Sequence, residues 1–239
     1  MKAILLAAGF GTRLGKLGKH TPKCLVDVHG RPLLDLWLEK LSEAGVSEFL
    51  INTHHQSFKV EEFIFNHPLR NKILIKYEKQ LLGTAGTLRE NKDFIDQDTF
   101  VLHADNYFEG DLNLFVQAHK SRPKECSMSM LTFIAKNPKN CGVVQTNSRN
   151  ILVSFHEKVN KPPSNIANGA VYIFTKKWRS DFDCLLNTAQ DISYDILPNM
   201  VNNAFCYFTE RTFVDIGTPE SLAFVQGILT ENGSQGLKV

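Results

Sequence analysis

The first half of the chain alternates short apolar runs with helical periodicity, and this alternation restricts the fold more than any other feature. Residues 3–7 form a continuous apolar run, which is typical of a strand covered on both faces. The apolar side chains of residues 33–41 fall on one helical face, and Gly45 supplies a stop signal. Further strands are predicted at residues 49–52, 73–77 and 100–104, with a short helix at 60–65. This order predicts a parallel sheet with helices on its faces.

The second half is less regular. Strands are predicted at residues 127–133, 142–145, 152–155 and 170–174, with short connections. We therefore expect an α/β fold of the Rossmann-like, three-layer αβα type, with a mostly parallel central sheet and a small antiparallel insertion. Thr218, Pro219 and Glu220 suit the first turn of a last helix. Residues 1–231 are predicted to form a single domain, and residues 232–239 a frayed tail.

The composition, net charge and cysteine count exclude several classes of protein. Among 239 residues, an apolar share of 43% and a charged share of 22% are ordinary for a globular chain. A net charge of +2 gives no reason to expect nucleic acid or a membrane as a partner. The five cysteines are scattered, so we expect reduced thiols and a cytoplasmic location. The apolar run at the N-terminus is too short for a signal peptide or a spanning helix.

A glycine-rich loop follows the first predicted strand. Gly9 and Gly11 stand two residues apart, where bare backbone amides could approach a phosphate or simply permit a tight turn. A dinucleotide-binding fingerprint would need a third glycine at Leu14, and the Gly-Lys-Ser/Thr of a P-loop is absent from the sequence. The loop instead carries cations, among them Arg13 and Lys23. A loop lysine such as Lys23 is expected to bury little surface.

The spacing of these residues resembles that of the sugar-1-phosphate nucleotidyltransferases, and most closely that of the short mannose-type and glycero-manno-heptose-type guanylyltransferases. The similar blocks follow one another in family order over residues 3 to about 225. They are GFGTR (9–13), TPK (21–23), GRPL (30–33), EAG (43–45), INTHH (51–55), LGTAG (82–86), HADN (103–106), FHEK (155–158), NGAVY (168–172) and VDIGTP (214–219). The resemblance implies the nucleotide-diphospho-sugar transferase fold.

The resemblance also implies a reaction, in which a nucleotidyl group passes from a nucleoside triphosphate to a sugar 1-phosphate and pyrophosphate leaves. It assigns Arg13 to the triphosphate and the departing pyrophosphate, and Lys23 to the α-phosphate and the attacking sugar phosphate. The forked guanidinium suits two phosphate oxygens, whereas the lysine ammonium is a mobile point charge. The residues expected to bind the nucleotide are Leu6, Ala8, Gly9, Gly11, Thr12, Glu78, Gly83 and Thr84.

Two aspartates are the predicted ligands of Mg²⁺. Asp105 follows the fourth predicted strand, at an edge where open α/β sheets bind ligands, and Asp215 lies far along the chain. Mg²⁺ favours one or two carboxylates together with phosphate oxygens and water. His54, His55 and His103 are expected to satisfy local hydrogen bonds instead, because a hard cation does not favour imidazole.

The resemblance suggests how the base and the acceptor are recognised. An ionised Glu78 can only accept hydrogen bonds, which suits guanine better than uracil or thymine, although cytosine stays open. The expected contacts of the sugar phosphate are Asn106, Glu157, Lys158, Asn168 and Gly169. Val159 stands where the family commonly has a proline after the lysine, and Cys24 replaces the usual proline after the signature lysine.

The sequence leaves two alternatives for the function open. The protein could be a cytidylyl- or uridylyltransferase acting on a different phosphorylated acceptor, or a non-catalytic homologue that senses a nucleotide sugar. The second alternative is disfavoured because Arg13, Lys23, Asp105 and Asp215 are all present. A homo-oligomer is compatible with the sequence, which shows no hexapeptide array of the kind that helps longer relatives to assemble.

Overall fold

The computed structural model describes residues 1–227. Its strands are β1 (Lys2–Leu6), β2 (Asp27–Val28), β3 (Arg31–Pro32), β4 (Glu48–Thr53), β5 (Ile73–Tyr77), β6 (Thr99–His103), β7 (Asn106–Phe108), β8 (Met128–Ile134), β9 (Gly142–Thr146), β10 (Leu152–Glu157), β11 (Ile166–Phe174), β12 (Ala204–Thr209) and β13 (Phe213–Asp215). Its α-helices are α1 (Lys16–His20), α2 (Leu33–Glu43), α3 (Ser57–Phe65), α4 (Thr84–Glu90), α5 (Leu112–Lys120), α6 (Lys176–Asp181), α7 (Asp183–Thr188) and α8 (Pro219–Val225).

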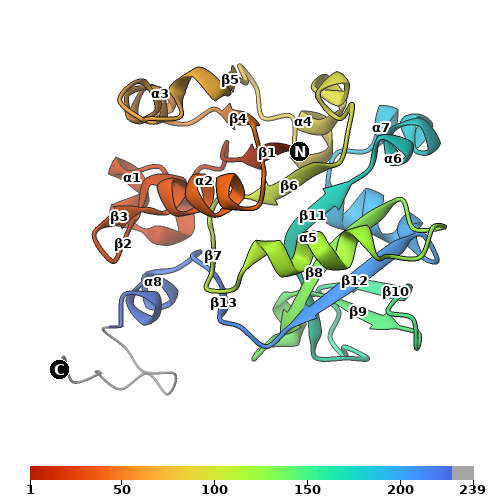
Figure 1. Ribbon diagram of the computed structural model, residues 1–239. Coiled ribbons are helices and arrows are strands. Elements are labelled where there is room, and N and C mark those ends of the chain that lie inside the picture. Colours follow the sequence, from red (N-terminus) through yellow and green to blue (C-terminus); the bar gives the residue numbers. More distant parts are fainter. Residues whose placement is uncertain (228–239) are drawn as a thin grey trace.

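The main sheet is mixed, as predicted (Figure 1). Its order is β10-β9-β11-β6-β1-β4-β5, with β8 paired to β11 and to β12. The strands β6, β1, β4 and β5 run parallel, whereas β11 is antiparallel to β6. All four predicted strands of the first half are confirmed, and so is the predicted irregularity of the second half. The carboxyl ends of the parallel strands therefore meet at one edge of the sheet.

The sheet is covered on both faces. Ala3 and Leu5 of β1 point into a core formed with α2, α3 and α5, two of which lie in front of the sheet in Figure 1. Ile4 and Leu6 of the same strand point into a second core, formed with α4, α6 and α7. Because successive side chains of a strand face opposite ways, a continuous apolar run fits a strand with a core on each side.

Other expectations for the chain have mixed outcomes. The helix predicted after Thr218 is confirmed, with the Thr218 side chain accepting a hydrogen bond from the backbone N–H of Ser221 at 3.2 Å. All five cysteines are free. The predicted tail at residues 232–239 lies outside the described residues, and a single domain over residues 1–231 stays a prediction. Within residues 1–227, no helix combines the length and apolar character that crossing a membrane requires.

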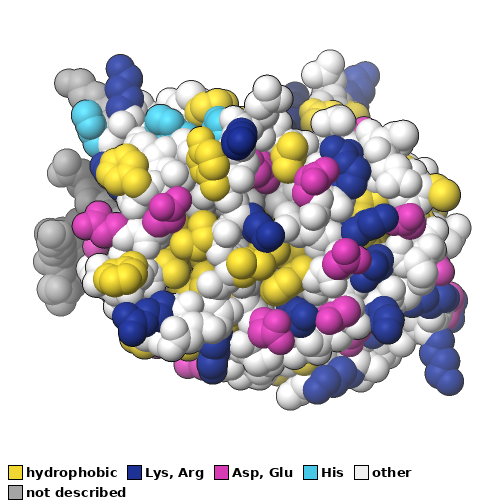
Figure 2. All heavy atoms as spheres, turned by 90° about the horizontal axis from the view of Figure 1, so that it is seen from above, with side chains coloured by type: hydrophobic (Ala, Val, Ile, Leu, Met, Phe, Trp, Pro, Cys, Tyr) yellow, Lys and Arg dark blue, Asp and Glu magenta, His cyan; other side chains and the backbone are white. Residues whose placement is uncertain are grey.

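Charges of both signs are interspersed over the face seen in Figure 2. Exposed hydrophobic side chains lie among these charges. Over the described chain as a whole, the exposed hydrophobic residues include Phe58 and Phe65 on α3 and Leu74 and Tyr77 on β5. Such single exposed apolar residues are usual on protein surfaces.

We expect the protein to lose stability as the pH falls below about 6.5, because a histidine is buried in neutral form. His119 is fully buried, and its Nδ1 lies 2.7 Å from the hydroxyl of Ser129. Burial lowers the pKa of His119 below its ordinary value of 6.5, although Asp98 opposes this shift. On acidification the unfolded chain therefore takes up the proton before the folded chain does. The free energy of unfolding decreases as the pH drops under 6.5, and it is fully retained at higher pH.

Thermal unfolding of the wild type and of His119→Gln at about pH 7.5 and about pH 5.5 checks this expectation. The wild type should lose more of its melting temperature between the two conditions than the variant does. Equal losses would assign the acid sensitivity to other groups.

Candidate active site

The loop after β1 is folded tightly around its glycines. Gly11 has a backbone φ of +67°, which L-residues rarely adopt. A Cβ on Gly18 would overlap the carbonyl oxygen of Gly11, so the two turns of the loop touch through bare backbone. The side-chain amide of Gln56 donates to the carbonyls of Gly18 and Lys19, at 3.3 and 3.0 Å. The loop is therefore fastened to the segment that follows β4.

Two ion pairs join this loop to the predicted metal ligands. Lys23 Nζ lies 2.8 Å from Oδ2 of Asp105, and Arg13 Nη2 lies 3.4 Å from Oδ2 of Asp215. The Lys23 side chain is only 12% exposed, whereas that of Arg13 is 62% exposed. The expectation that Lys23 buries little is therefore wrong. Gly11 contributes to this burial, because a Cβ there would lie 3.3 Å from Cγ of Lys23.

The fold brings Asp105 and Asp215 together. The strands β7 and β13 form an antiparallel ladder in which Asn106 pairs with Asp215. The next residue, Ile216, donates its backbone N–H to the carbonyl of Asp105 at 3.1 Å. Burial opposes ionisation of Asp105, but the charges of Lys23 and His103 and the hydrogen bond from Lys23 together outweigh it and hold the pKa of this carboxyl below its usual value. Both acids therefore stand beside the glycine loop.

This pair of carboxylates fits a hard divalent cation. Two oxygen ligands from adjacent backbone positions suit an ion that completes its coordination with phosphate oxygens and water. Within residues 1–227, no group of three or more His, Cys, Asp or Glu side chains could hold a metal alone. The donor set thus suits a cation that is bound together with a phosphorylated substrate rather than a permanent protein cage.

A pocket of about 240 Å³ opens at the carboxyl ends of β1 and β6. Six of the eight residues predicted to bind the nucleotide line it, whereas Gly11 and Thr12 do not. Its lining residues are Leu6, Ala8, Gly9, Asn52, Glu78, Leu81, Gly83, Thr84, Thr87, His103 and Asp105.

Glu78 is fixed at the back of this pocket. Its Oε1 accepts hydrogen bonds from Nδ2 of Asn52 at 2.8 Å and from the hydroxyl of Thr87 at 2.6 Å. Its Oε2 accepts a single bond, from the backbone N–H of Leu82 at 3.2 Å. Asn52 also accepts from the backbone N–H of Ala7 at 2.7 Å, so one amide ties the start of the glycine loop to Glu78. The carboxylate is held in one orientation and retains accepting capacity at Oε2.

The turn at Gly83 is clamped to a distant segment. A Cβ on Gly83, whose φ is +75°, would overlap the carbonyl oxygen of Gln190. The hydroxyl of Thr84 donates to Oδ2 of Asp191 at 3.1 Å and accepts from the backbone N–H of Ile192 at 2.7 Å. The pocket wall is therefore continuous with a short π-helix, Ile192–Ile196.

The predicted acceptor residues Glu157 and Lys158 lie at the end of β10. The Glu157 side chain is 10% exposed, and its Oε1 lies 3.4 Å from Nζ of Lys158. Burial raises the pKa of Glu157, while Lys158 opposes the rise. A Cβ on Gly142 would overlap Oε2 of Glu157, so the glycine lets this carboxylate pack closely against β9. Cys141 lies close by, since its carbonyl accepts the backbone N–H of Lys158 at 3.1 Å, and burial raises the pKa of its thiol, as do the charges of Glu157 and Asp215.

The other predicted acceptor residues lie in an irregular part of β11 or form hydrogen bonds with it. The Asn168 amide donates to the Tyr172 hydroxyl at 2.8 Å, and its oxygen accepts from the backbone N–H of Ala170 at 2.8 Å. Ala170 has a φ of +50°, and the register of β11 against β8 shifts here. Asn106 is buried, and its amide donates to the carbonyl of Gly169 at 3.1 Å. The sugar contacts predicted for Asn106, Asn168 and Gly169 stay predictions, and the polar atoms of both amides help to hold the bulge.

The three histidines differ in their surroundings. His54 Nδ1 lies 2.7 Å from the carbonyl of Glu78, and His55 Nε2 lies 2.9 Å from Nε2 of Gln56, as expected for local hydrogen bonding. The same expectation is wrong for His103, whose side chain has no hydrogen-bond partner within residues 1–227. His103 instead lines the nucleotide pocket.

Comparison with known proteins places this site in a family. A family model described as nucleotidyl transferase matches residues 2–232. The chain belongs to the nucleotidyl transferase family.

Curated relatives of this nucleotidyl transferase include two microbial proteins. One, from Sulfolobus acidocaldarius and provisionally named mannose-1-phosphate guanyltransferase, is 31% identical over 224 residues, which is 92% of this chain and 60% of that protein. The D-glycero-alpha-D-manno-heptose 1-phosphate guanylyltransferase of Campylobacter jejuni is 28% identical over 220 residues, covering 92% of this chain and 96% of that protein. The chain thus spans about three fifths of the first relative and nearly all of the second.

Solved structures confirm the fold of the transferase. Crystalline HddC from Yersinia pseudotuberculosis superposes with a TM-score of 0.76 at 24% identity, covering 94% of this chain and 97% of that one. HddC in complex with GMP-PN gives a TM-score of 0.74 at 23% identity, with the same coverage. The expected nucleotide-diphospho-sugar transferase fold is therefore borne out, and enzymes of this family generally use a divalent metal ion.

Several side chains that shape the site have no role predicted from the sequence. Asn52 lies within the INTHH block and Thr87 follows the LGTAG block, so both stand in or beside matched motifs. Asp191 lies outside every quoted block, and its carboxylate accepts from the backbone N–H groups of Ser193 and Tyr194. A polar residue that binds other protein groups gives no local signal in a sequence.

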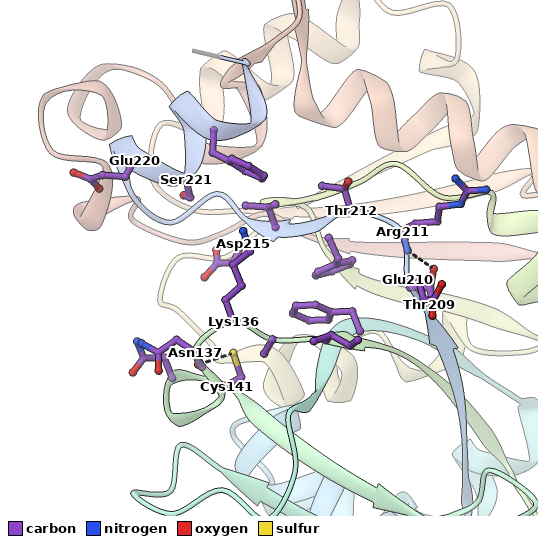
Figure 3. Close-up of a pocket in the computed structure, with 17 residues that line it drawn as sticks. Lys136, Asn137, Cys141, Thr209, Glu210, Arg211, Thr212, Asp215, Glu220 and Ser221 are labelled. Carbon is purple, nitrogen blue, oxygen red and sulfur yellow. Dashed lines mark hydrogen bonds between the residues drawn. The ribbon is translucent and has the colours of Figure 1, made fainter. Parts of the chain in front are cut away.

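A larger cleft, of about 780 Å³, lies on the other side of Asp215 (Figure 3). Apolar side chains including Phe133, Phe213 and Phe224 line it, and Lys136 and Arg211 stand at its polar positions. Asp215 is therefore carried between the cleft and the glycine loop on a strand of three residues. Nothing in the described residues identifies an occupant for this cleft.

The Lys23–Asp105 pair should contribute more stability than the Arg13–Asp215 pair. We expect Lys23→Met to lower the free energy of unfolding by about 1–3 kcal/mol, because a partly buried carboxylate loses its partner. The matched variant Arg13→Met should change it by less than about 0.5 kcal/mol, because that pair is exposed. Urea unfolding measures both, and Lys23→Met combined with Asp105→Asn should recover most of the loss. Equal effects of the two single variants would contradict this ranking.

Proposed function

We propose that the protein transfers a guanylyl group from GTP to a hexose or heptose 1-phosphate, with Mg²⁺ as the metal ion. The observation that carries the proposal is the pairing of both signature cations of the glycine loop with both predicted metal ligands. The names of the Sulfolobus and Campylobacter relatives, and the GMP-PN bound by HddC, support the choice of guanine. A cytoplasmic location goes with this proposal.

The chemistry is an in-line displacement. An oxygen of the sugar 1-phosphate attacks the α-phosphorus of GTP, the bond from that phosphorus to the oxygen bridging to the β-phosphate breaks, and pyrophosphate leaves with the bonding electrons. The attacking oxygen is already an anion, so no general base is needed. The remaining task is to align two polyanions and to neutralise the charge that develops on the leaving group.

The residues of this chain suit that task. In the proposal, Arg13 binds the triphosphate and the departing pyrophosphate, while Lys23 binds the α-phosphate and the incoming sugar phosphate. Asp105 and Asp215 would hold Mg²⁺, which supplies positive charge to the phosphate oxygens. Substrate binding must then compete with the two ion pairs, so the cations exchange carboxylate partners for phosphate partners. Their positions are set before substrate arrives.

Recognition of the base would come from Glu78. Its Oε1 already accepts hydrogen bonds from Asn52 and Thr87, whereas Oε2 accepts one only, from the backbone N–H of Leu82. Guanine presents two donors on one edge, N1–H and the N2 amino group, and an ionised carboxylate can accept from them. The segments with Glu157, Lys158, Asn168 and Gly169 would then receive the sugar.

Measuring pyrophosphate release tests the activity directly. The enzyme is incubated with GTP, UTP, CTP or dTTP together with Mg²⁺ and either mannose 1-phosphate or D-glycero-D-manno-heptose 1-phosphate. We expect release with GTP and one of these acceptors, and loss of release after chelation of the metal. Release with UTP or CTP but not with GTP would overturn the base assignment, and no release with any pair would favour a nucleotide-sugar-sensing protein.

Glu78→Gln is expected to weaken use of GTP. The amide can still accept from Asn52 and Thr87 through one atom, but its other atom becomes a donor that faces the donors of guanine. We expect kcat/KM for GTP to fall about tenfold or more, since an unpaired polar edge in a pocket costs about 1–3 kcal/mol. Initial rates at several GTP concentrations check this. An unchanged kcat/KM in a normally folded variant would remove Glu78 from base recognition.

A further inference from the structure

His103 occupies the end of the central strand β6, beside the predicted metal ligand Asp105. Leu6 of β1 is its partner in the parallel ladder, so both residues stand at the carboxyl edge of the sheet. His103 is partly buried, and it lines the nucleotide pocket together with Asp105. Ligands of open α/β sheets bind at this edge. The imidazole is therefore presented to the place where substrates are expected.

His103 is the uncommitted donor of that pocket. Three other lining side chains can donate hydrogen bonds, and Asn52, Thr84 and Thr87 all donate to carboxylates of the protein. Within the described part of the chain, the imidazole of His103 has no such partner. Either neutral tautomer of histidine carries one N–H group. A polar side chain kept at a pocket wall without a partner is available to a ligand.

His103 also lies between the two halves of the site. Burial opposes ionisation of both Asp105 and Glu157, and His103 is among the charges that lower the pKa of each carboxyl. Asp105 belongs to the side where the triphosphate is proposed to bind, and Glu157 to the acceptor side. The pairing of the strands places His103 in the same way: β11 runs antiparallel to β6 with Val171 opposite Leu102, so the end of β11 that carries Asn168 and Gly169 comes beside His103. His103 therefore stands between the Asp105 side and the predicted acceptor side.

The other donors are placed toward the triphosphate. Arg13 is paired with Asp215 and Lys23 with Asp105, and the bare amides of the glycine loop lie on the same side. On the acceptor side, Glu157 can only accept hydrogen bonds when ionised, and Lys158 is 55% exposed. A phosphate arriving from the acceptor side therefore meets His103 as a donor at the wall of the pocket.

We propose that His103 is a catalytic residue that donates a hydrogen bond to the phosphate of the sugar 1-phosphate and aligns it for attack. This inference rests on the proposed function. A donor at this point would hold the acceptor phosphate on a second side, in addition to Lys23, which in the proposed function contacts both the α-phosphate and the sugar phosphate. The nucleophile then has a contact of its own besides the shared lysine, which restricts the directions from which it can approach the α-phosphorus.

Two variants of His103 test the proposal by initial-rate kinetics. His103→Leu removes the donor but keeps much of the bulk, whereas His103→Gln keeps an N–H donor. We expect His103→Leu to raise KM for the sugar 1-phosphate about tenfold or more and to leave KM for GTP within about twofold. His103→Gln should recover most of the acceptor affinity. His29→Asn, an exposed position between β2 and β3, is the matched control and should behave as the wild type.

The outcomes separate this inference from the proposed function. A wild type that releases no pyrophosphate counts against the function and takes the inference with it. With an active wild type, unchanged acceptor KM in His103→Leu, or a raised KM for GTP alone, overturns the role of His103 only. Melting temperatures identify a folding defect in the leucine variant, and in that event His103→Phe, which also lacks an N–H donor, decides: a raised KM for the sugar 1-phosphate at wild-type melting temperature supports the proposal, and an unchanged one overturns it.

Discussion

Lys23 and Asp105, held 2.8 Å apart beside the nucleotide pocket, form the contact on which the rest of the site depends. A carboxylate at a phosphate-binding edge would repel its substrate, and burial makes its ionisation more costly. The lysine removes both difficulties, because it keeps Asp105 ionised and places a cation where a phosphate must come. The bare backbone at Gly11 and Gly18 lets the loop fold closely enough for this contact. The glycines therefore serve the placement of a charge as much as the turn itself.

The parallel half of the fold could be predicted because its signals are local. The run at β1, the apolar face of α2 and the cap at Thr218 each lie within a few residues, and all three are confirmed. The elements without a prediction are those whose pattern is blurred. In β12 nearly every side chain is apolar or aromatic, so no alternation marks its two faces. In α5 the buried face includes His119, which a hydropathy pattern counts as polar.

The candidate site was predictable to the extent that its residues fall in motifs. Asp105 and Asp215 lie together as the resemblance implies, but no local pattern announces the ladder between β7 and β13 that joins them. The network around Glu78 could not be predicted for a similar reason, since Asn52 and Thr87 come from different elements and bind protein groups. Asn106 is the opposite example: it lies in a matched motif, yet its side-chain amide donates a hydrogen bond to a backbone carbonyl of the protein.

The strand that carries Asp215 has a consequence for how the protein would fail under heat. In the described residues β13 is three residues long and pairs with β7 alone, and a wide cleft lies beside it. Short, partly solvated ladders open at a small fraction of the free energy that global unfolding needs. Detachment of this strand would separate the two acids while both cores stay packed. Thermal inactivation would then precede melting, and the working temperature of the protein would be set by its smallest ladder rather than by its sheet.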